Sequence, residues 1–204
     1  DDVTPNAYEE VWDTTTGGDV RIDGRSGKNL FTYDSPSFSG VMFKMAHQQS
    51  SEETTATDNN YDLGHYTDFG IQISPEMVEG LTLGYGAGEI MTAANTHKDN
   101  STMYAKYAVG GFTLGYQQSE SDHDTVSSSQ ESTAYGITYA VNDDFSIGYS
   151  YHELETESAT DQDQESTGVS ASYTSGGMTL AGAMNEVDNM GGTGTTDREG
   201  YEFT

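Results

Sequence analysis

Phe112-Thr113-Leu114-Gly115-Tyr116-Gln117 alternates large apolar side chains with small or polar ones. Successive side chains of a β-strand point to opposite faces, so this stretch predicts a strand with one apolar face and one small or polar face. The apolar positions lack the three- and four-residue spacing of an amphipathic helix, which makes a helix here a poor interpretation.

The same alternation recurs through residues 135–141, 145–152 and 168–173. Tight turns at 109–112, 141–145 and 175–178, and a slightly longer turn at 75–80, connect some of these segments. Long polar loops connect the others, at about residues 50–60, 94–101, 118–131, 154–166 and 187–198. Short turns at one end and long loops at the other are typical of an outer-membrane β-barrel.

The pattern predicts about eleven antiparallel strands, so the fold class is an all-β transmembrane barrel. The predicted strands cover residues 28–35, 38–49, 60–74, 80–93, 101–109, 112–119, 131–141, 144–154, 165–175, 178–187 and 198–204. Bacterial single-chain barrels close with an even number of strands, and residues 200–204 stop in mid-alternation. We therefore expect a partial barrel that lacks sequence at both ends.

The composition narrows the class of protein. The hydrophobic fraction is 33% and the net charge is -27, as in many disordered chains, but 14 Tyr, 7 Phe and only 3 Pro argue against disorder. With Cys at 0, neither a disulfide nor a thiolate metal site is expected. No apolar run approaches the ~20 residues of a membrane-spanning helix. The chain opens on Asp1-Asp2-Val3 without a signal peptide, which we interpret as a start inside a longer protein.

A soluble β-sandwich is the main structural alternative, because its strands also alternate. Its core face would be rich in Leu, Val and Ile. Here the apolar face is rich in Tyr and Phe, and the opposite face is Gly, Ser, Thr and Ala, which favours the barrel. The barrel predicts that one set of side chains faces outward: Phe112, Leu114, Tyr116, Ile137, Tyr139, Phe145, Ile147, Tyr149 and Tyr173. It predicts that another set faces the lumen: Gly115, Thr138, Ser146, Gly148, Ser150 and Ser172.

The stretch from Asn29 to Val41 resembles the general porins of Gram-negative bacteria, in which Asn-x-x-x-Tyr-x-Ser-Pro-x-Phe-x-Gly follows an inward-folded third loop. The matching residues are Asn29, Tyr33, Ser35, Pro36, Phe38 and Gly40. The resemblance implies that residues 1–27 are the constriction loop and its flanks, and that residues 28–204 are strands six to sixteen of a barrel of about sixteen. Five strands would precede the chain, and a C-terminal aromatic residue would follow it.

The resemblance also implies a function and a location. It implies passive diffusion of small hydrophilic solutes across the bacterial outer membrane, without catalysis. It implies a homotrimer in contact with outer-membrane lipid and lipopolysaccharide. A run of small residues at 84–87 and the stretch Met42-Phe43-Lys44-Met45 give a weak local hint of close packing between subunits.

Charged residues are the candidate pore residues. Acidic side chains crowd the expected constriction loop, and basic ones follow or lie on the small-residue face of predicted strands. An acidic loop that faces a basic wall would create a transverse field across the pore, and loop carboxylates favour cations. The alternative is a merely solvated acidic loop. The candidate constriction residues are Glu9, Glu10, Asp13, Asp19, Asp23, Arg21, Arg25, Lys28, Lys44 and Lys106.

Other kinds of site have little support. Calcium has candidate ligands in Asp1, Asp2 and Glu9, and further ones at 122–124 and 161–165, but the clusters at 122–124 and 161–165 do not match an EF-hand loop, and no cofactor is expected. Neither a paired-histidine metal motif nor a Gly-x-Ser-x-Gly elbow is present. Nucleic acid is an implausible partner for a chain with 7 basic and 34 acidic residues.

Two alternative functions stay open. One is an acidic secreted or surface adhesin-like β-protein with calcium-dependent binding. The other is an outer-membrane barrel enzyme, which would need a catalytic constellation that the sequence does not present. The high acidity is explained either by cation preference or by a saline habitat.

Overall fold

The structure is a computed structural model that describes residues 3–7, 30–49, 65–93, 96–124, 129–157, 162–192, 194 and 196–204. One antiparallel sheet of 11 strands, in the order of the chain, holds all the described strands. The strands are β1 Leu30–Asp34, β2 Val41–Gln48, β3 Tyr66–Ile73, β4 Leu81–Ala93, β5 Thr96–Val109, β6 Phe112–His123, β7 Gln130–Ala140, β8 Phe145–Thr156, β9 Gln164–Ser175, β10 Met178–Asp188 and β11 Arg198–Phe203, with a 3-10 turn η3 at Met190–Gly192.

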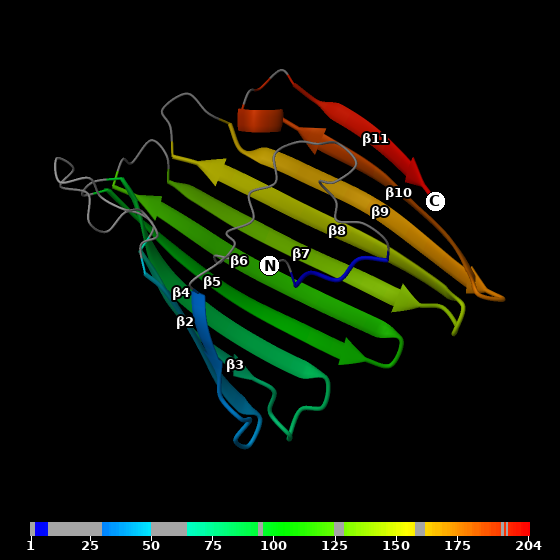
Figure 1. Cartoon of the computed structure of the whole chain (residues 1–204). Helices are drawn as coiled ribbons and strands as arrows, with labels where there is room; N and C mark the ends of the chain where they lie inside the picture. Colours follow the sequence, from blue (N-terminus) through cyan, green and yellow to red (C-terminus); the bar gives the residue numbers. More distant parts are fainter. Residues whose placement is uncertain are drawn as a thin grey trace.

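The sheet is curved and open, with β1 and β11 at its two edges (Figure 1). Each strand pairs only with the strands next to it in sequence, as in an up-and-down barrel wall. No second sheet is present among the described strands, so the all-β antiparallel prediction is confirmed and the β-sandwich alternative is wrong. None of the described residues forms a helix that is long and apolar enough to span a membrane.

Two of the predicted loops are wrong in part. The polar stretch 94–101 was expected to be a loop, but β5 already begins at Thr96, and β6 continues to His123 inside the predicted loop 118–131. Asp99 and Asp122 are direct cross-strand partners. The strands therefore continue as paired polar ladders beyond their apolar part, and the polarity that suggested loops is a property of these strand ends. The predicted loop at 50–60 and the start of the strand predicted at 60 lie outside the described residues.

The tight turns are found where they were predicted. Between β9 and β10 the turn residues Gly176 and Gly177 have φ values of +60° and +81°. Both values lie in the left-handed region, which glycine adopts without a steric cost. In the turn between β7 and β8, the backbone N–H of Asp144 donates to Oδ1 of Asn142 at 2.9 Å.

The Ser-Pro-x-Phe-x-Gly stretch forms the corner between β1 and β2. Ser35 Oγ accepts a hydrogen bond from the backbone N–H of Phe43 at 2.8 Å, which ties the first strand to the second. Gly40 has a φ of +81°, and a Cβ there would lie 2.0 Å from the carbonyl oxygen of Ser74. The corner thus packs directly on the end of β3, which explains why its last residue is glycine.

The outer face of the sheet is apolar and exposed. Of the side chains predicted to face outward, all but the half-buried Phe145 are exposed. Neighbouring outer rings stack across strands, with centroids 4.4 Å apart for Phe112 and Tyr139 and 4.7 Å apart for Tyr135 and Tyr151. These rings do not meet in a central dry core, so the predicted orientation is confirmed. Exposed aromatic and aliphatic side chains on one sheet face are suited to lipid contact.

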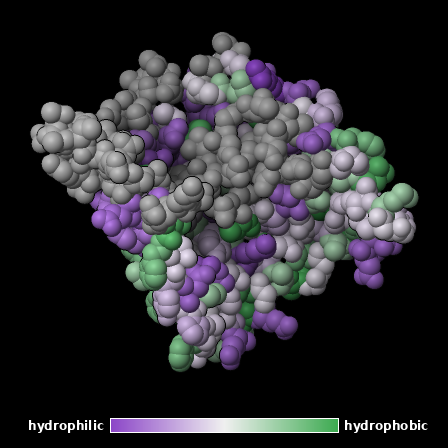
Figure 2. Space-filling model, in the orientation of Figure 1, coloured by the Kyte–Doolittle hydropathy of each residue, from purple (hydrophilic) through white to green (hydrophobic). Residues whose placement is uncertain are grey.

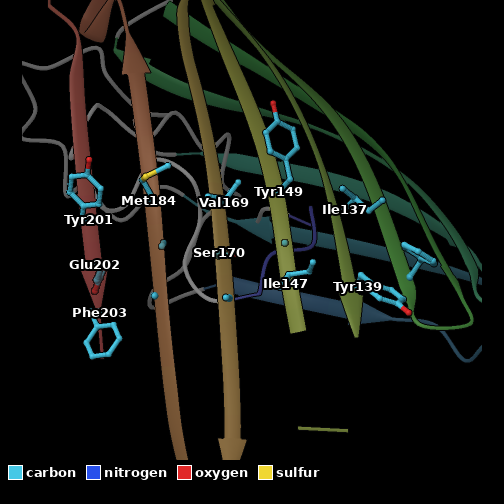
Figure 3. A pocket seen from close by; sticks show the side chains of 15 residues that line it. Ile137, Tyr139, Ile147, Tyr149, Val169, Ser170, Met184, Tyr201, Glu202 and Phe203 are labelled. Carbon is cyan, nitrogen blue, oxygen red and sulfur yellow. The ribbon is translucent and has the colours of Figure 1, made fainter. Parts of the chain in front are cut away.

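A shallow apolar hollow of about 870 Å³ lies on this outer face between β6 and β11. Outer positions of β9 and β10 pair Ala171 with Gly182, so the wall is thin there. Larger side chains of the neighbouring positions stand around it, among them Tyr149, Val169 and Met184 (Figure 3).

Candidate functional site: the inner wall

The inner face of the sheet is the face that carries Gly115 and its cross-strand partner Gly136. Small and polar side chains dominate it, and Ser132, Ser150 and His152 are buried there. Ser132 Oγ lies 2.9 Å from His152 Nε2. Figure 2 shows hydrophilic and near-neutral residues over much of the described surface in this view, with apolar residues among them. The inner face therefore suits water and polar solutes.

Residues 3–7, the crossing segment, lie on this face and run across the strands from β6 to β9. Figure 1 shows the segment in dark blue over the middle of the sheet. The backbone N–H of Val3 donates to Gln117 Oε1 on β6 at 2.9 Å. The backbone N–H of Ala7 donates to Ser170 Oγ on β9 at 3.1 Å. The central residue, Pro5, is buried against the wall.

Every basic side chain of the described strands occupies an inner position. Lys106 is the cross-strand partner of Gly115. It is therefore adjacent to the part of the inner wall that the crossing segment contacts. Lys44 is exposed and lies 4.0 Å from Asp34 Oδ1, an ion pair that contributes little at an exposed position. The basic inner residues are Lys44, Lys98, Lys106 and Arg198. The inner carboxylates of the described strands are Asp34, Asp68 and Glu202.

The outer face carries the opposite charge at the loop end of the strands. Beyond the apolar positions, outer carboxylates lie directly opposite one another across neighbouring strands, and we call these the outer carboxylate rows. In one row Glu131 lies between Glu120 on β6 and Glu155 on β8. The rows consist of Glu89, Asp99, Asp122, Glu120, Glu131, Glu155, Glu153, Glu165, Asp188, Glu186 and Glu199.

Neighbouring carboxylates and partial burial raise the pKa of two glutamates of the outer carboxylate rows, Glu120 and Glu155. The carboxylate of Asp122, with burial and Glu131 as smaller causes, raises the pKa of Glu120. Burial and the neighbouring carboxylates of Asp163 and Glu131 raise the pKa of Glu155. Both shifts follow from the lower stability of a charge that is partly desolvated beside other negative charges.

Most of the predicted constriction residues lie outside the described residues: Glu9, Glu10, Asp13, Asp19, Asp23, Arg21, Arg25 and Lys28. The calcium candidates Asp1, Asp2 and Glu9 lie outside them too. Lys44 and Lys106 occupy inner positions of β2 and β5, the face on which strand parity placed them. In the part of the chain that is described, no group of three or more His, Cys, Asp or Glu side chains is arranged to hold a metal ion.

Two inner basic residues were missed from the sequence. Lys98 was assigned to a loop, although it lies eight positions before Lys106, an even difference, and shares its face once β5 is extended. Arg198 is the first residue of β11, and the apolar residues Tyr201 and Phe203 that follow it set the parity of this strand. The signal was therefore present in the sequence for both Lys98 and Arg198, and the pairing of Arg198 with Val187 agrees with it.

Comparisons with known proteins agree with this architecture. A solved structure with a similar fold is the anion-selective porin from Comamonas acidovorans, with a TM-score of 0.70 and 18% identity over 85% of this chain. Another is OmpT, an outer membrane protein of Vibrio cholerae, with a TM-score of 0.56 and 14% identity over 85% of this chain. The chain spans 57% of the length of the first and 62% of the second. No curated protein sequence matches the chain significantly.

A sequence model described as Gram-negative porin matches residues 1–204. That match covers the whole chain and agrees with the antiparallel wall, its apolar outer face and its polar inner face. The location is accordingly the bacterial outer membrane. The chain belongs to the Gram-negative porin family.

Proposed function

We propose that the full-length protein is a passive diffusion channel for small hydrophilic solutes. The observation that carries this proposal is the division of one sheet into an exposed apolar face and a polar face crossed by residues 3–7. A wall of this kind separates lipid from a hydrated path. Diffusion along such a path requires neither catalysis nor a cofactor, and we propose neither.

Residues 1–27 serve as the constriction loop in this proposal. The support is the position of the crossing segment, which lies on the inner face over β6 to β9. Lys106 lies beside that contact, at a position from which a wall charge acts on passing ions.

We further propose that the channel prefers cations only weakly. The expectation of cation preference drew on the net charge of -27. Much of that charge belongs to the outer carboxylate rows, which face away from the path of the solute. The loop carboxylates favour cations in this proposal, and the inner lysines Lys98 and Lys106 oppose them.

The proposed function is tested with the full-length protein in lipid. Liposomes that contain it should swell in neutral sugars at rates that fall as the sugar grows, and planar bilayers should show stepwise conductance. A protein that stays soluble without detergent and binds a surface ligand only with calcium would instead be the adhesin-like alternative. Absence of both swelling and conductance in correctly folded protein would overturn the channel proposal.

The loop assignment has its own test. Changing Glu9, Glu10 and Asp13 to Gln, Gln and Asn removes charge while nearly preserving size. The reversal potential across a salt gradient should move toward anion preference, and more so in dilute salt, where the screening length is longer. The matched control changes Glu120, Glu131 and Glu155 to Gln, because these lie on the outer face. Equal shifts in both variants would mean that surface charge sets selectivity.

We also propose that the full-length protein assembles as a homotrimer in contact with outer-membrane lipid and lipopolysaccharide. The exposed outer face provides apolar surface for both kinds of contact. The mass of the protein in mild detergent distinguishes a trimer from a monomer, and a monomeric mass would contradict this assembly.

A further inference from the structure

The crossing segment lies on a patch of the inner wall that we call the seat, which consists of Gln117, Ser170, Gly115, Gly136 and Gly148. Hydrogen bonds hold the segment at the two ends of this patch. Gln117 Oε1 accepts from the backbone of Val3, and Ser170 Oγ accepts from the backbone of Ala7. Both acceptors are wall side chains and both donors are main-chain groups. Main-chain groups of the segment are therefore tied to the wall at both of its ends.

Between these ends the seat is made of glycines that leave room for the segment. A Cβ on Gly115 would lie 2.4 Å from Pro5 Cδ, and a Cβ on Gly136 would lie 2.5 Å from the carbonyl oxygen of Pro5. A Cβ on Gly148 would lie 3.0 Å from the backbone nitrogen of Ala7. The first two distances are shorter than real Cβ contacts, so a side chain at either position would displace the segment.

Other inner glycines do not have this role. A Cβ on Gly86 would meet nothing closer than 3.6 Å, and one on Gly70 nothing closer than 3.5 Å, both ordinary van der Waals contacts. A Cβ on Gly84 or Gly88 would meet the side chain of Tyr104 or Asp68 on a neighbouring strand, at 2.1 Å and 2.8 Å. The glycines whose added Cβ would meet the crossing segment are Gly115, Gly136 and Gly148. The central residue of the segment, Pro5, also suits contact with these glycines, because it has no N–H that would need an acceptor there.

We propose that Gln117 and Ser170 are positioning residues that, with Gly115, Gly136 and Gly148, hold the crossing segment at a fixed place in the lumen and so set the size limit of the pore. This inference rests on the proposed channel function. Because the contact is made through main-chain donors, its loss frees the segment to move while the strands keep their pairing.

Two kinds of variant of the full-length protein test this proposal in planar bilayers and liposomes. The double variant Gln117→Leu, Ser170→Ala removes both acceptors while keeping the side chains close in size. Gly136→Ala pushes on the backbone of Pro5. Both should change single-channel conductance and should shift the size limit for oligosaccharides, with additional conductance substates in the double variant.

Gly86→Ala is the matched control, since it adds the same methyl group to an inner strand glycine outside the seat. It should leave conductance and size limit unchanged. Gln117→Glu keeps an acceptor oxygen and, combined with the native Ser170, should restore the size limit. If Gln117 only stabilised the wall, its variants would lose folding and would not change the size limit of a folded channel.

A labelling experiment tests the seat without relying on conduction. The chain has no cysteine, so Ala7→Cys provides a unique thiol on the segment. A water-soluble maleimide should label it faster when Gln117→Leu and Ser170→Ala are also present. If labelling, conductance and size limit are all unchanged in folded variants of a conducting parent, the seat is overturned and the channel function stands. If the folded parent does not conduct, the channel function fails while labelling still reports on the seat.

Discussion

The inner wall and the loop end of the outer wall are built from the same strands but carry different charges. β5 contributes Lys98 and Lys106 to the inner wall, and it contributes Asp99 to the outer carboxylate rows. The assignment depends only on strand parity, because neighbouring residues point to opposite faces. A net charge for the chain therefore says little about the field in the pore, and each charge has to be counted on its own face.

The largest expected effect comes from moving a charge onto the apolar part of the outer face. Ile147→Lys places an ammonium group among exposed lipid-facing side chains, at a cost of about 2–4 kcal/mol near the bilayer midplane. Its neighbour Ser146 points inward, so Ser146→Lys should cost much less. Urea unfolding in phospholipid vesicles, followed by circular dichroism, measures both. Similar losses in the two variants would contradict the assignment of faces.

Removal of inner charge should change ion selectivity next most strongly. In water, a unit charge acts on an ion about 6 Å away with about 0.7 kcal/mol, a factor of about three in relative permeability. The double variant Lys98→Gln, Lys106→Gln should therefore increase cation preference several times over, measured as the reversal potential in dilute salt. Glu153→Gln with Glu165→Gln is the outer control and should change it little. A reversed ranking would place these lysines away from the ion path.

Removal of one carboxylate from the outer rows should stabilise the fold slightly. Glu131 faces Glu120 and Glu155, and like charges directly opposite cost roughly 0.2–1 kcal/mol per pair. Glu131→Gln should raise the urea midpoint in dilute salt, and the gain should vanish near 1 M salt, where screening acts within about 3 Å. Glu76→Gln, in the turn between β3 and β4, is the control. A gain that is insensitive to salt would have a cause other than charge repulsion.

The smallest effect concerns pH. The raised pKa values of Glu120 and Glu155 mean that the folded protein binds more protons than the unfolded chain in the window above the ordinary value of 4.5. Their contribution to stability therefore decreases as the pH rises through that window and is most favourable below it. Glu120→Gln with Glu155→Gln should flatten the pH dependence of the urea midpoint. An unchanged slope would exclude these two groups as its source.

The strands and their faces could be predicted because alternation is a local property. Parity alone placed Lys44 and Lys106 on the inner face, and the Gly-Gly turn at 176–177 was visible in the sequence. The outer carboxylate rows could not be predicted, because they exist only through the register between strands. In addition, Asp99, Glu120 and Asp122 lay in stretches that were predicted to be loops. Because the polar stretch 94–101 was interpreted as a loop, neither Asp99 nor Lys98 was assigned to a face of the sheet.

The contacts between the crossing segment and its seat could not be predicted from the sequence for a different reason. Its hydrogen bonds join residues 114 and 163 positions apart. No periodicity relates Val3 to Gln117, and the glycines beneath the segment look like other inner glycines in the sequence. Only the curvature of the assembled sheet brings these groups together.

That separation has a consequence for the order in which the molecule forms. Neighbouring strands of the sheet are also neighbours in sequence, so the wall can grow hairpin by hairpin through short loop closures. The contacts of Val3 and Ala7 require that β6 to β9 already lie side by side, and they close far longer loops. We therefore expect the crossing segment to dock after the wall is paired, so that a nascent barrel passes through a wider, unrestricted stage before its pore narrows.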